Sequence, residues 1–367
     1  MSMDAKAKKR ILTVGCCVVI AAGGYSGFLG IRSMIGPKQP LSHAELMQTP
    51  ELKAEAEDLK QTIVVPHLEQ AIDGGKNVLW CATFQMCWNR SIKTFDSQLA
   101  SLSEPPMARS LNRHLVTADD LDPDSYVICA APSGGPEFVA QVEKALDEKF
   151  DGGANPELLY RIPSELGPGN WVTYCYLFKH LPFEHFFERS REALDFDGKP
   201  VKSFGTLGVR PERSFRLAEQ VIVYHFANAD EFVLELITES SSDRLILAKV
   251  EPGPTLLSTI RSVQAKLDAE NPESGQRFLQ LAIPVINFDI FRRYDEFAGY
   301  YAVQQTRFRL DEKGAALVSE ASLGGGGIPA TSLIFDKPFL IMIQRVGAKM
   351  PYCALWVANA ELLVPYE

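Results

Sequence analysis

The sequence predicts an α+β fold built around a large, mostly antiparallel β-sheet. Helical patterns dominate the first half of the chain and strand patterns the second half, an order typical of this class. Apolar residues make up 46% of the 367 residues and charged residues 23%, so the chain can bury a sizeable core without disulfides or a metal. A net charge of −9 argues against a nucleic-acid partner.

The first forty residues differ in character from the rest. Residues 1–10 carry four basic side chains and one acidic side chain, and residues 11–31 form a run of 21 without a charged side chain. A helix of about 20 apolar residues spans a bilayer, and its basic flank stays in the cytoplasm. We therefore expect a basic cytoplasmic tail (1–10), a transmembrane signal anchor (11–31), a linker (32–44) and a domain (45–367), with residues 32–367 outside the cytoplasm.

A cleaved signal peptide is the alternative for the same segment. Residues 11–22 are long enough for the apolar region of such a peptide, and Ala22-Gly23-Gly24 provides small residues for cleavage. The domain would then be secreted rather than held at the membrane. Both interpretations export it from the cytoplasm.

The cysteine content is compatible with export. Cys16 and Cys17 lie in the apolar run, and the exported part contains Cys81, Cys87, Cys129, Cys175 and Cys353. No two of these five have the C-x-x-C spacing of many metal and redox sites. Because five is odd, at least one thiol stays unpaired or pairs between chains, and the pairing of the others stays open.

The first half of the exported part predicts mainly helices. Residues 42–72 have Glu, Lys, Leu and Ala at helix-compatible positions. Asn77–Phe95 begins with apolar residues on both faces, so we expect it at the centre of the fold. Residues 101–125 predict loops around a short helix, and Phe138–Phe150 predicts an amphipathic helix that ends at Asp151-Gly152-Gly153.

The second half predicts strands. Eight segments have the β-branched and aromatic content of strands: Trp171–Phe178, Gln220–Phe226, Glu231–Ile237, Leu245–Lys249, Phe278–Ile283, Tyr300–Leu310, Pro338–Arg345 and Ala354–Asn359. Their number indicates a large sheet, with no internal repeat along the chain.

Motifs of catalysis and metal binding are missing from the sequence. His180 and His185 are five residues apart around Pro182, which is not the spacing of a helical zinc site. The acidic run 119–124 lacks the glycine and terminal glutamate of a calcium loop. Phosphate-binding loops and the G-x-S-x-G elbow of hydrolases are also absent. We therefore expect no catalytic residue, no metal and no cofactor, and a protein that is not an enzyme.

The stretch Leu310–Asn359 carries the strongest functional signal. A predicted strand ends near Gly314, and small residues follow it up to four consecutive glycines, Gly324–Gly327. The chain then returns through Phe335–Leu340 into apolar strands. Loops longer than about 15 residues without their own structure are uncommon and are usually functional or disordered.

These residues resemble the C-terminal part of the serpins. In that family a strand ends in Glu-x-Gly, an exposed reactive loop of small residues follows, and Phe-x-x-Pro-Phe leads into two buried strands. Glu312-x-Gly314 and Phe335-Asp336-Lys337-Pro338-Phe339 match that order. Ala354–Asn359 is similar to the last strand of the family, although its glycine is absent.

Other segments resemble serpin elements in the same order along the chain. They are Asn77-Val78-Leu79-Trp80, where Cys81-Ala82 replaces the family's Ser-Pro; Val172–Lys179 with Pro182-Phe183; and Phe278–Ile286 with Tyr294-Asp295. The resemblance covers about residues 45–365. The stretch between Asn77 and Tyr174 is several tens of residues shorter than usual, which implies missing helical elements.

The resemblance implies a serine-type endopeptidase inhibitor with a cleavable reactive loop at 312–334. In serpins a protease cleaves the loop, which inserts into the main sheet as a new strand while the enzyme is still acylated. The implied hinge is Glu312, Gly314, Ala315, Ala316 and Leu317, and the implied scissile region is Gly326, Gly327, Ile328 and Pro329. Cleavage between Gly327 and Ile328 would suit an elastase-like or subtilisin-like protease. We expect a monomer.

Some residues of the loop depart from the pattern of efficient inhibitors. Leu317 and Val318 are larger than the usual hinge residues, Gly324–Gly327 has poor strand propensity, and Pro329 makes the bond before it resistant to most serine proteases. The alternative function is therefore a non-inhibitory, serpin-like binding module anchored to the membrane. An exported enzyme with an unrecognised site is a third possibility.

Overall fold

The structure is a computed structural model. It describes residues 50–73, 75–99, 106–151, 154, 156–161, 171–269, 273–274, 279–295, 301–315 and 331–367. The predicted anchor at 11–31 and most of the predicted loop lie outside these residues. No helix within them is both long and apolar enough to cross a membrane. The unit that begins at Leu41 extends to the last residue, Glu367.

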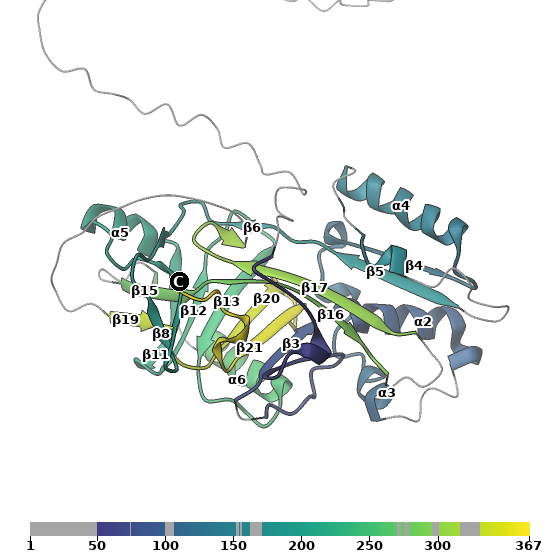
Figure 1. The fold of residues 1–367 in the computed structure, drawn as a ribbon, viewed down its shortest axis with the longest axis horizontal. Coiled ribbons are helices and arrows are strands. Elements are labelled where there is room, and N and C mark those ends of the chain that lie inside the picture. Colours follow the sequence, from purple (N-terminus) through teal and green to yellow (C-terminus); the bar gives the residue numbers. More distant parts are fainter. Residues whose placement is uncertain are drawn as a thin grey trace, which may run out of the picture. The chain divides into compact units, whose positions relative to one another are not determined.

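An eight-stranded sheet lies at the centre of this unit (Figure 1). Its strands, in spatial order, are β14 (Glu273–Ser274), β11 (Val221–Asn228), β12 (Glu231–Leu236), β13 (Asp243–Lys249), β20 (Phe339–Arg345), β21 (Cys353–Val357), β3 (Asn77–Cys81) and β2 (Thr62–Val65). All neighbours pair antiparallel except β2 and β3. The inner strands bury apolar side chains on both faces. The prediction of a large, mostly antiparallel sheet is thus confirmed.

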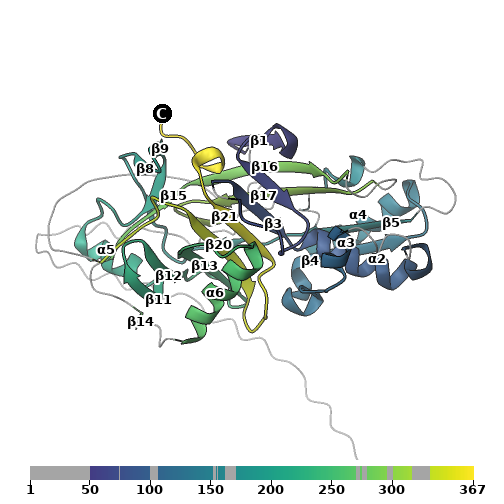
Figure 2. The ribbon, with the colours of Figure 1, turned by 90° about the horizontal axis from the view of Figure 1, so that it is seen from below.

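Two layers cover the faces of the eight-stranded sheet (Figure 2). The helix α6 (Leu256–Ala269) lies on one face and buries Leu256, Ile260, Val263 and Leu267. On the other face lies a three-stranded sheet formed by β1 (Leu52–Glu55), β16 (Ile286–Arg293) and β17 (Val303–Leu310). In β17 every second residue is buried, as expected for a strand with one face on the core.

The remaining strands form one four-stranded sheet and three strand pairs. A four-stranded sheet has the order β19 (Thr331–Ile334), β15 (Leu279–Pro284), β10 (Ser203–Gly205) and β7 (Glu188–Arg189). Three strand pairs are β4 (Tyr126–Ala131) with β5 (Val172–Leu177), β6 (Leu181–Pro182) with β18 (Gly314–Ala315), and β8 (Leu194–Phe196) with β9 (Lys199–Val201).

The helices of the first half enclose the β4–β5 pair. Helix α4 (Pro136–Phe150) packs Phe138, Val142 and Leu146 on one face of the pair. Helix α2 (Thr83–Leu99) packs on the opposite face, and α3 (Pro106–Leu111) lies against α2. The β4–β5 pair is therefore a thin sheet between two layers of helix.

The segment before β3 contradicts its prediction. Residues 42–72 were expected to be helical, but the described part forms β1, a 3-10 turn at Ala56–Asp58 and β2. Leu52–Glu55 pairs in parallel with Phe288–Phe291 of β16, and Thr62–Val65 pairs in parallel with β3. Strand pairing with distant residues overrides the local helix propensity here.

The expected helix at Phe138–Phe150 and the eight expected strands are confirmed. The helix at Phe138–Phe150 ends at Asp151, which adopts the left-handed conformation with φ of 48°. The eight predicted strands all appear, with boundaries shifted by a few residues. Unpredicted elements include β4, β16, α6 and α5 (Pro211–Ala218).

Asn77 forms hydrogen bonds with neighbouring segments at the β2 edge of the eight-stranded sheet. Its buried side-chain amide donates to Thr62 Oγ1 (3.0 Å) and to Asn359 Oδ1 (2.9 Å). Its side-chain carbonyl accepts from the backbone N–H of Ala358 (2.7 Å) and of Asn359 (3.0 Å). One side chain therefore connects β2, β3 and the residues that follow β21.

We expect Asn77→Ala to lower the free energy of unfolding by about 3 kcal/mol, because it removes four hydrogen bonds and leaves the backbone N–H groups of Ala358 and Asn359 without their acceptor. Urea denaturation of the variant measures this loss. The control is Asn228→Ala, at an exposed position, which should change the free energy of unfolding by less than about 1 kcal/mol. Equal effects of the two substitutions would contradict the role of Asn77.

Candidate functional site

The candidate site is the base of the predicted reactive loop and the strands around it. Glu312 and Gly314 are described, as is the backbone of Ala315. Ala316, Leu317, Gly326, Gly327, Ile328 and Pro329 lie outside the described residues. The structure therefore describes where the chain enters and leaves the loop segment.

The entry to the loop is held by strand pairing. Gly314 and Ala315 pair antiparallel with Pro182 and Leu181. The backbone N–H of Phe183 donates to Lys313 O (2.9 Å), and the N–H of Phe187 donates to Glu312 O (2.7 Å). The hinge is thus bound to the segment that follows β5.

Glycine is required at position 314. Its φ of 120° is a conformation that residues with a Cβ rarely adopt. A Cβ at this position would lie 2.4 Å from Leu181 O and 2.7 Å from Pro182 Cα. The glycine of the Glu-x-Gly pattern therefore permits both the turn and the close approach of β6.

A cluster of charged side chains, whose carboxylates are buried, lies next to this turn. Asp311 pairs with Arg309 (2.6 Å), and Glu312 pairs with Arg189 (2.6 Å). Burial raises the pKa of Asp311, with the neighbouring Glu312 carboxylate adding to the effect, and burial lowers the pKa of Lys313. Removing one member of such a pair leaves an uncompensated buried charge, so the cluster fixes the position of the hinge.

The return from the loop has a separate anchor. Strand β19 pairs in parallel with β15, and Phe335 and Phe339 are then buried beside one another. The buried Lys249 of β13 donates to Asp336 Oδ1 (2.6 Å), to Ile334 O (3.1 Å) and to Ala229 O (2.9 Å). The Phe-x-x-Pro-Phe segment is therefore held by two aromatic rings and one ammonium group.

Two strand edges lie beside the entry to the loop. Within the described residues β5 pairs only with β4, and β17 pairs only with β16. Trp171 before β5 and Ala302 before β17 pack in the same apolar cluster. After the two strands, β6 and β18 pair with each other. Strands β5 and β17 thus run in the same direction, start together and end together, without a shared hydrogen-bond ladder.

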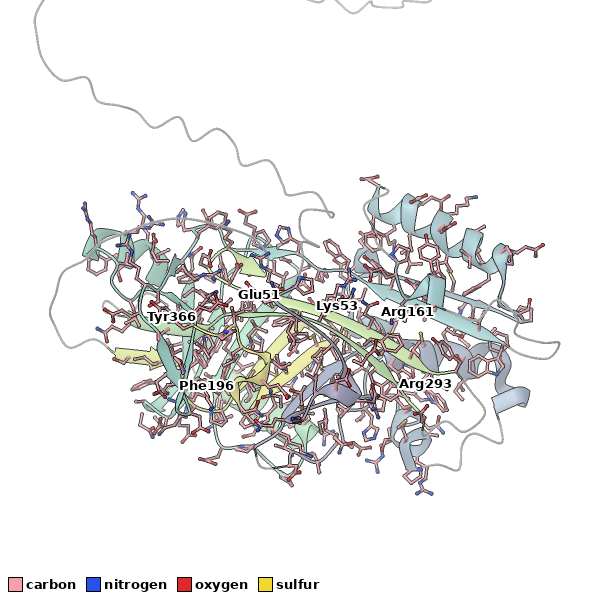
Figure 3. All side chains as sticks on the ribbon, viewed as in Figure 1. Glu51, Lys53, Arg161, Phe196, Arg293 and Tyr366 are labelled. Atoms are coloured by element: carbon pink, nitrogen blue, oxygen red, sulfur yellow. The ribbon has the colours of Figure 1, made fainter. Side chains whose placement is uncertain are left out.

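The segment 156–161, before β5, forms ion pairs with strands β1 and β17 of the three-stranded sheet. Glu157 pairs with Arg307 of β17 (2.5 Å) and with Lys53 of β1 (3.8 Å). Arg161 pairs with Glu55 (3.7 Å); Lys53 and Arg161 are labelled in Figure 3. The hydrogen bond from Arg307 lowers the pKa of Glu157, so this carboxylate is ionised at neutral pH. Leu159 of the same segment packs in the apolar cluster that contains Val172 and Tyr174 of β5, so these ion pairs join the layer of β5 to β1 and β17.

Several residues of this site carry no signal in the sequence. Arg189, Lys249, Glu157 and Arg307 act through partners more than 80 residues away along the chain. A single basic or acidic residue in a strand looks like a solvent-exposed side chain until its partner is known. Among the described residues no group of three or more potential ligands could hold a metal ion.

Substitution of Gly314 tests the close approach of β6. We expect Gly314→Ala to lower the free energy of unfolding by about 3 kcal/mol or more, because both backbone strain and overlap with β6 oppose it. The control is Gly347→Ala, where φ is 78° but no atom lies within 4 Å of the added Cβ. That variant should lose only about 1–2 kcal/mol. Equal losses in urea denaturation would show that β6 does not constrain the hinge.

His180 lies between β5 and β6. Its buried Nε2 has no hydrogen-bond partner among the described residues, and burial lowers its pKa from 6.5. The folded state therefore favours neutral His180. The stability that results is fully present above about pH 6.5, and it is lost as the pH falls through the lowered pKa. We expect the urea midpoint to fall between pH 7.5 and 5.5, and His180→Gln to reduce that fall. An unchanged pH profile would contradict this assignment.

Comparisons with known proteins find matches among solved structures alone. No family model matches the chain, and no curated protein matches it significantly. Among solved structures, human thyroxine-binding globulin complexed with thyroxine is similar at 10% identity, over 78% of this chain and 92% of that chain, with a TM-score of 0.44. A serpin from the trematode Schistosoma haematobium is similar at 12% identity, over 78% and 94% of the two chains, with a TM-score of 0.42. Both TM-scores are below 0.5, so we base the α+β fold class on the sheets and helices of this chain itself.

Proposed function

We propose that this protein is a serpin-like inhibitor of serine endopeptidases that acts through the loop 312–334. The observation that carries the proposal is the arrangement of β5 and β17, which run alongside each other without a shared ladder in the described part of the chain. A cleaved loop could enter between them as a new strand. In this proposal residues 11–31 hold the domain at a membrane, with residues 32–367 outside the cytoplasm.

The direction in which β17 enters the loop is compatible with this insertion. Strand β17 leads directly to Gly314, so a chain that turns there runs back antiparallel to both β17 and β5. Before cleavage the far end of the loop is fixed at Thr331, because β19 pairs with β15. This second attachment opposes complete insertion of the intact loop.

Cleavage releases enough chain to fill the space. If the bond between Gly327 and Ile328 is cut, the 13 residues 315–327 remain attached to the hinge. Extended, they span about 43 Å, whereas the eight residues of β17 span about 27 Å. The residues that would share the inward phase are uncharged: Ala315, Leu317, Ser319, Ala321 and Leu323. Burying them in the sheet therefore carries no charge penalty.

The direct test is the formation of a covalent complex. We expect incubation with an elastase-like or subtilisin-like protease to give an adduct that survives a denaturing gel. Leu317→Arg should abolish the adduct while the loop is still cleaved, because insertion would bury a charge in the sheet. The control is Glu320→Arg, on the outward phase, which should keep adduct formation. Cleavage without any adduct in the unmodified protein would reject inhibition by trapping.

A further prediction concerns the ion pairs of Glu157. We expect Glu157→Gln to accelerate adduct formation roughly threefold, because it weakens the contact with Arg307 that restrains β5 relative to β17. Glu148→Gln on α4 is the control, since its only described ion pair joins it to Lys144 on the same exposed helix surface. A rate equal to that of the control would show that Glu157 does not restrain the strands.

A non-inhibitory binding module is the second candidate. The observation that favours it is the pairing of the buried Asp311 and Glu312 with Arg189, together with the pairing of Gly314 against β6. These contacts hold the hinge in place and oppose its movement. A nicked protein that shows neither an adduct nor a gain in stability would support this candidate.

A further inference from the structure

Helix α2 and strand β5 are in register where they pack together. Ser91 Oγ donates to Thr173 Oγ1 (2.8 Å), and the Cys87 thiol, one helical turn earlier, points to Thr173 O (3.8 Å). Four residues of helix advance about 6 Å, and two residues of strand advance about 6.6 Å. Cys87 is therefore placed opposite Cys175, as Ser91 is placed opposite Thr173.

The two thiols lie on the same side of the β4–β5 pair, at the packing of α2 against β5. The neighbouring Cys87 thiol, followed by burial, raises the pKa of Cys175 well above its usual value. Both residues are partly buried, and both are reduced in the structure. Cys129 faces the opposite side of the β4–β5 pair, in the cluster with α4, so it does not belong with these two thiols.

A second cysteine pair lies in the eight-stranded sheet. Cys81 of β3 is directly opposite Cys353 of β21. The neighbouring Ala82 donates its backbone N–H to Tyr352 O, so Cys81 and Cys353 form a pair without backbone hydrogen bonds to each other, in which side chains approach closely. A bond between them would join two strands that are already paired. A bond between Cys87 and Cys175 would instead join a helix to a strand.

We propose that Cys87 and Cys175 are a site of oxidative modification, at which an intramolecular disulfide links α2 to β5. The oxidant is a low-molecular-weight disulfide of the glutathione class. The Cys87 thiolate attacks one sulfur of the oxidant, forms a mixed disulfide and releases one thiol. The Cys175 thiol then loses its proton, attacks the Cys87 sulfur and releases the second thiol. Two protein thiols are oxidised, and one oxidant disulfide is reduced to two thiols.

The disulfide has a consequence for the neighbouring strand edge. It closes a loop of about 90 residues, which restricts the unfolded chain and should raise the thermal midpoint by about 5–10 °C. It also fixes β5 on α2. This effect rests on the proposed function, in which the cleaved loop enters between β5 and β17. If β5 shifts during that entry, the oxidised protein should form its protease adduct more slowly than the reduced protein.

The experiment is a disulfide map of the full chain, which does not depend on loop insertion. The reduced protein is treated with oxidised glutathione, alkylated with N-ethylmaleimide under denaturing conditions and digested without reductant for mass spectrometry. We expect a linked peptide that contains Cys87 and Cys175, lost in Cys87→Ser and in Cys175→Ser. Cys129→Ser is the matched control and should keep the linkage.

Two results would overturn the proposal. One is a wild-type map in which Cys87 and Cys175 both carry maleimide or glutathione. The other is a map in which the Cys81–Cys353 linkage is present and the Cys87–Cys175 linkage is not. Because neither result involves a protease, failure here is distinguishable from failure of the proposed inhibition.

Discussion

Backbone N–H and C=O groups need hydrogen-bond partners, and this requirement shapes the region between β5 and β17. Each strand has a partner on one side, β4 or β16, and neither has a strand partner on its other side within the described residues. The strands meet at both ends, through the cluster around Trp171 and through the β6–β18 pair. A strand added here would complete two ladders at once, and each backbone hydrogen bond adds about 1 kcal/mol of stability.

The two ends of the loop segment are anchored by different physical means. Gly314 provides a backbone conformation and a close approach to β6 that other residues cannot adopt. The return depends on Lys249, which reaches Asp336 and two backbone carbonyl groups from inside β13. Because both anchors belong to separate sheets, the loop is held at two fixed points. In the proposed mechanism, cleavage between them would separate the two ends of the segment and leave both anchors intact.

The sequence predicted the sheet-rich second half and the two motifs at the ends of the loop, because local residue types determine them. Phe335 and Phe339 indicated burial, and Glu312-x-Gly314 indicated the turn. The strand at Leu52–Glu55 was missed because its partner, β16, lies more than 230 residues further along the chain. The ion pairs of Glu157 and Arg189 and the placement of Cys87 opposite Cys175 were missed for the same reason, since spacing along the chain does not reveal contacts between distant elements.

In the proposed mechanism the cleaved loop becomes a strand between β5 and β17. The most direct measurement is the thermal midpoint of the purified protein before and after a single cut in the loop by subtilisin. New ladders along both strands should add several kcal/mol of stability, so the account predicts a rise of about 10 °C or more. An unchanged or lower midpoint, with the cut confirmed by mass spectrometry, would contradict insertion.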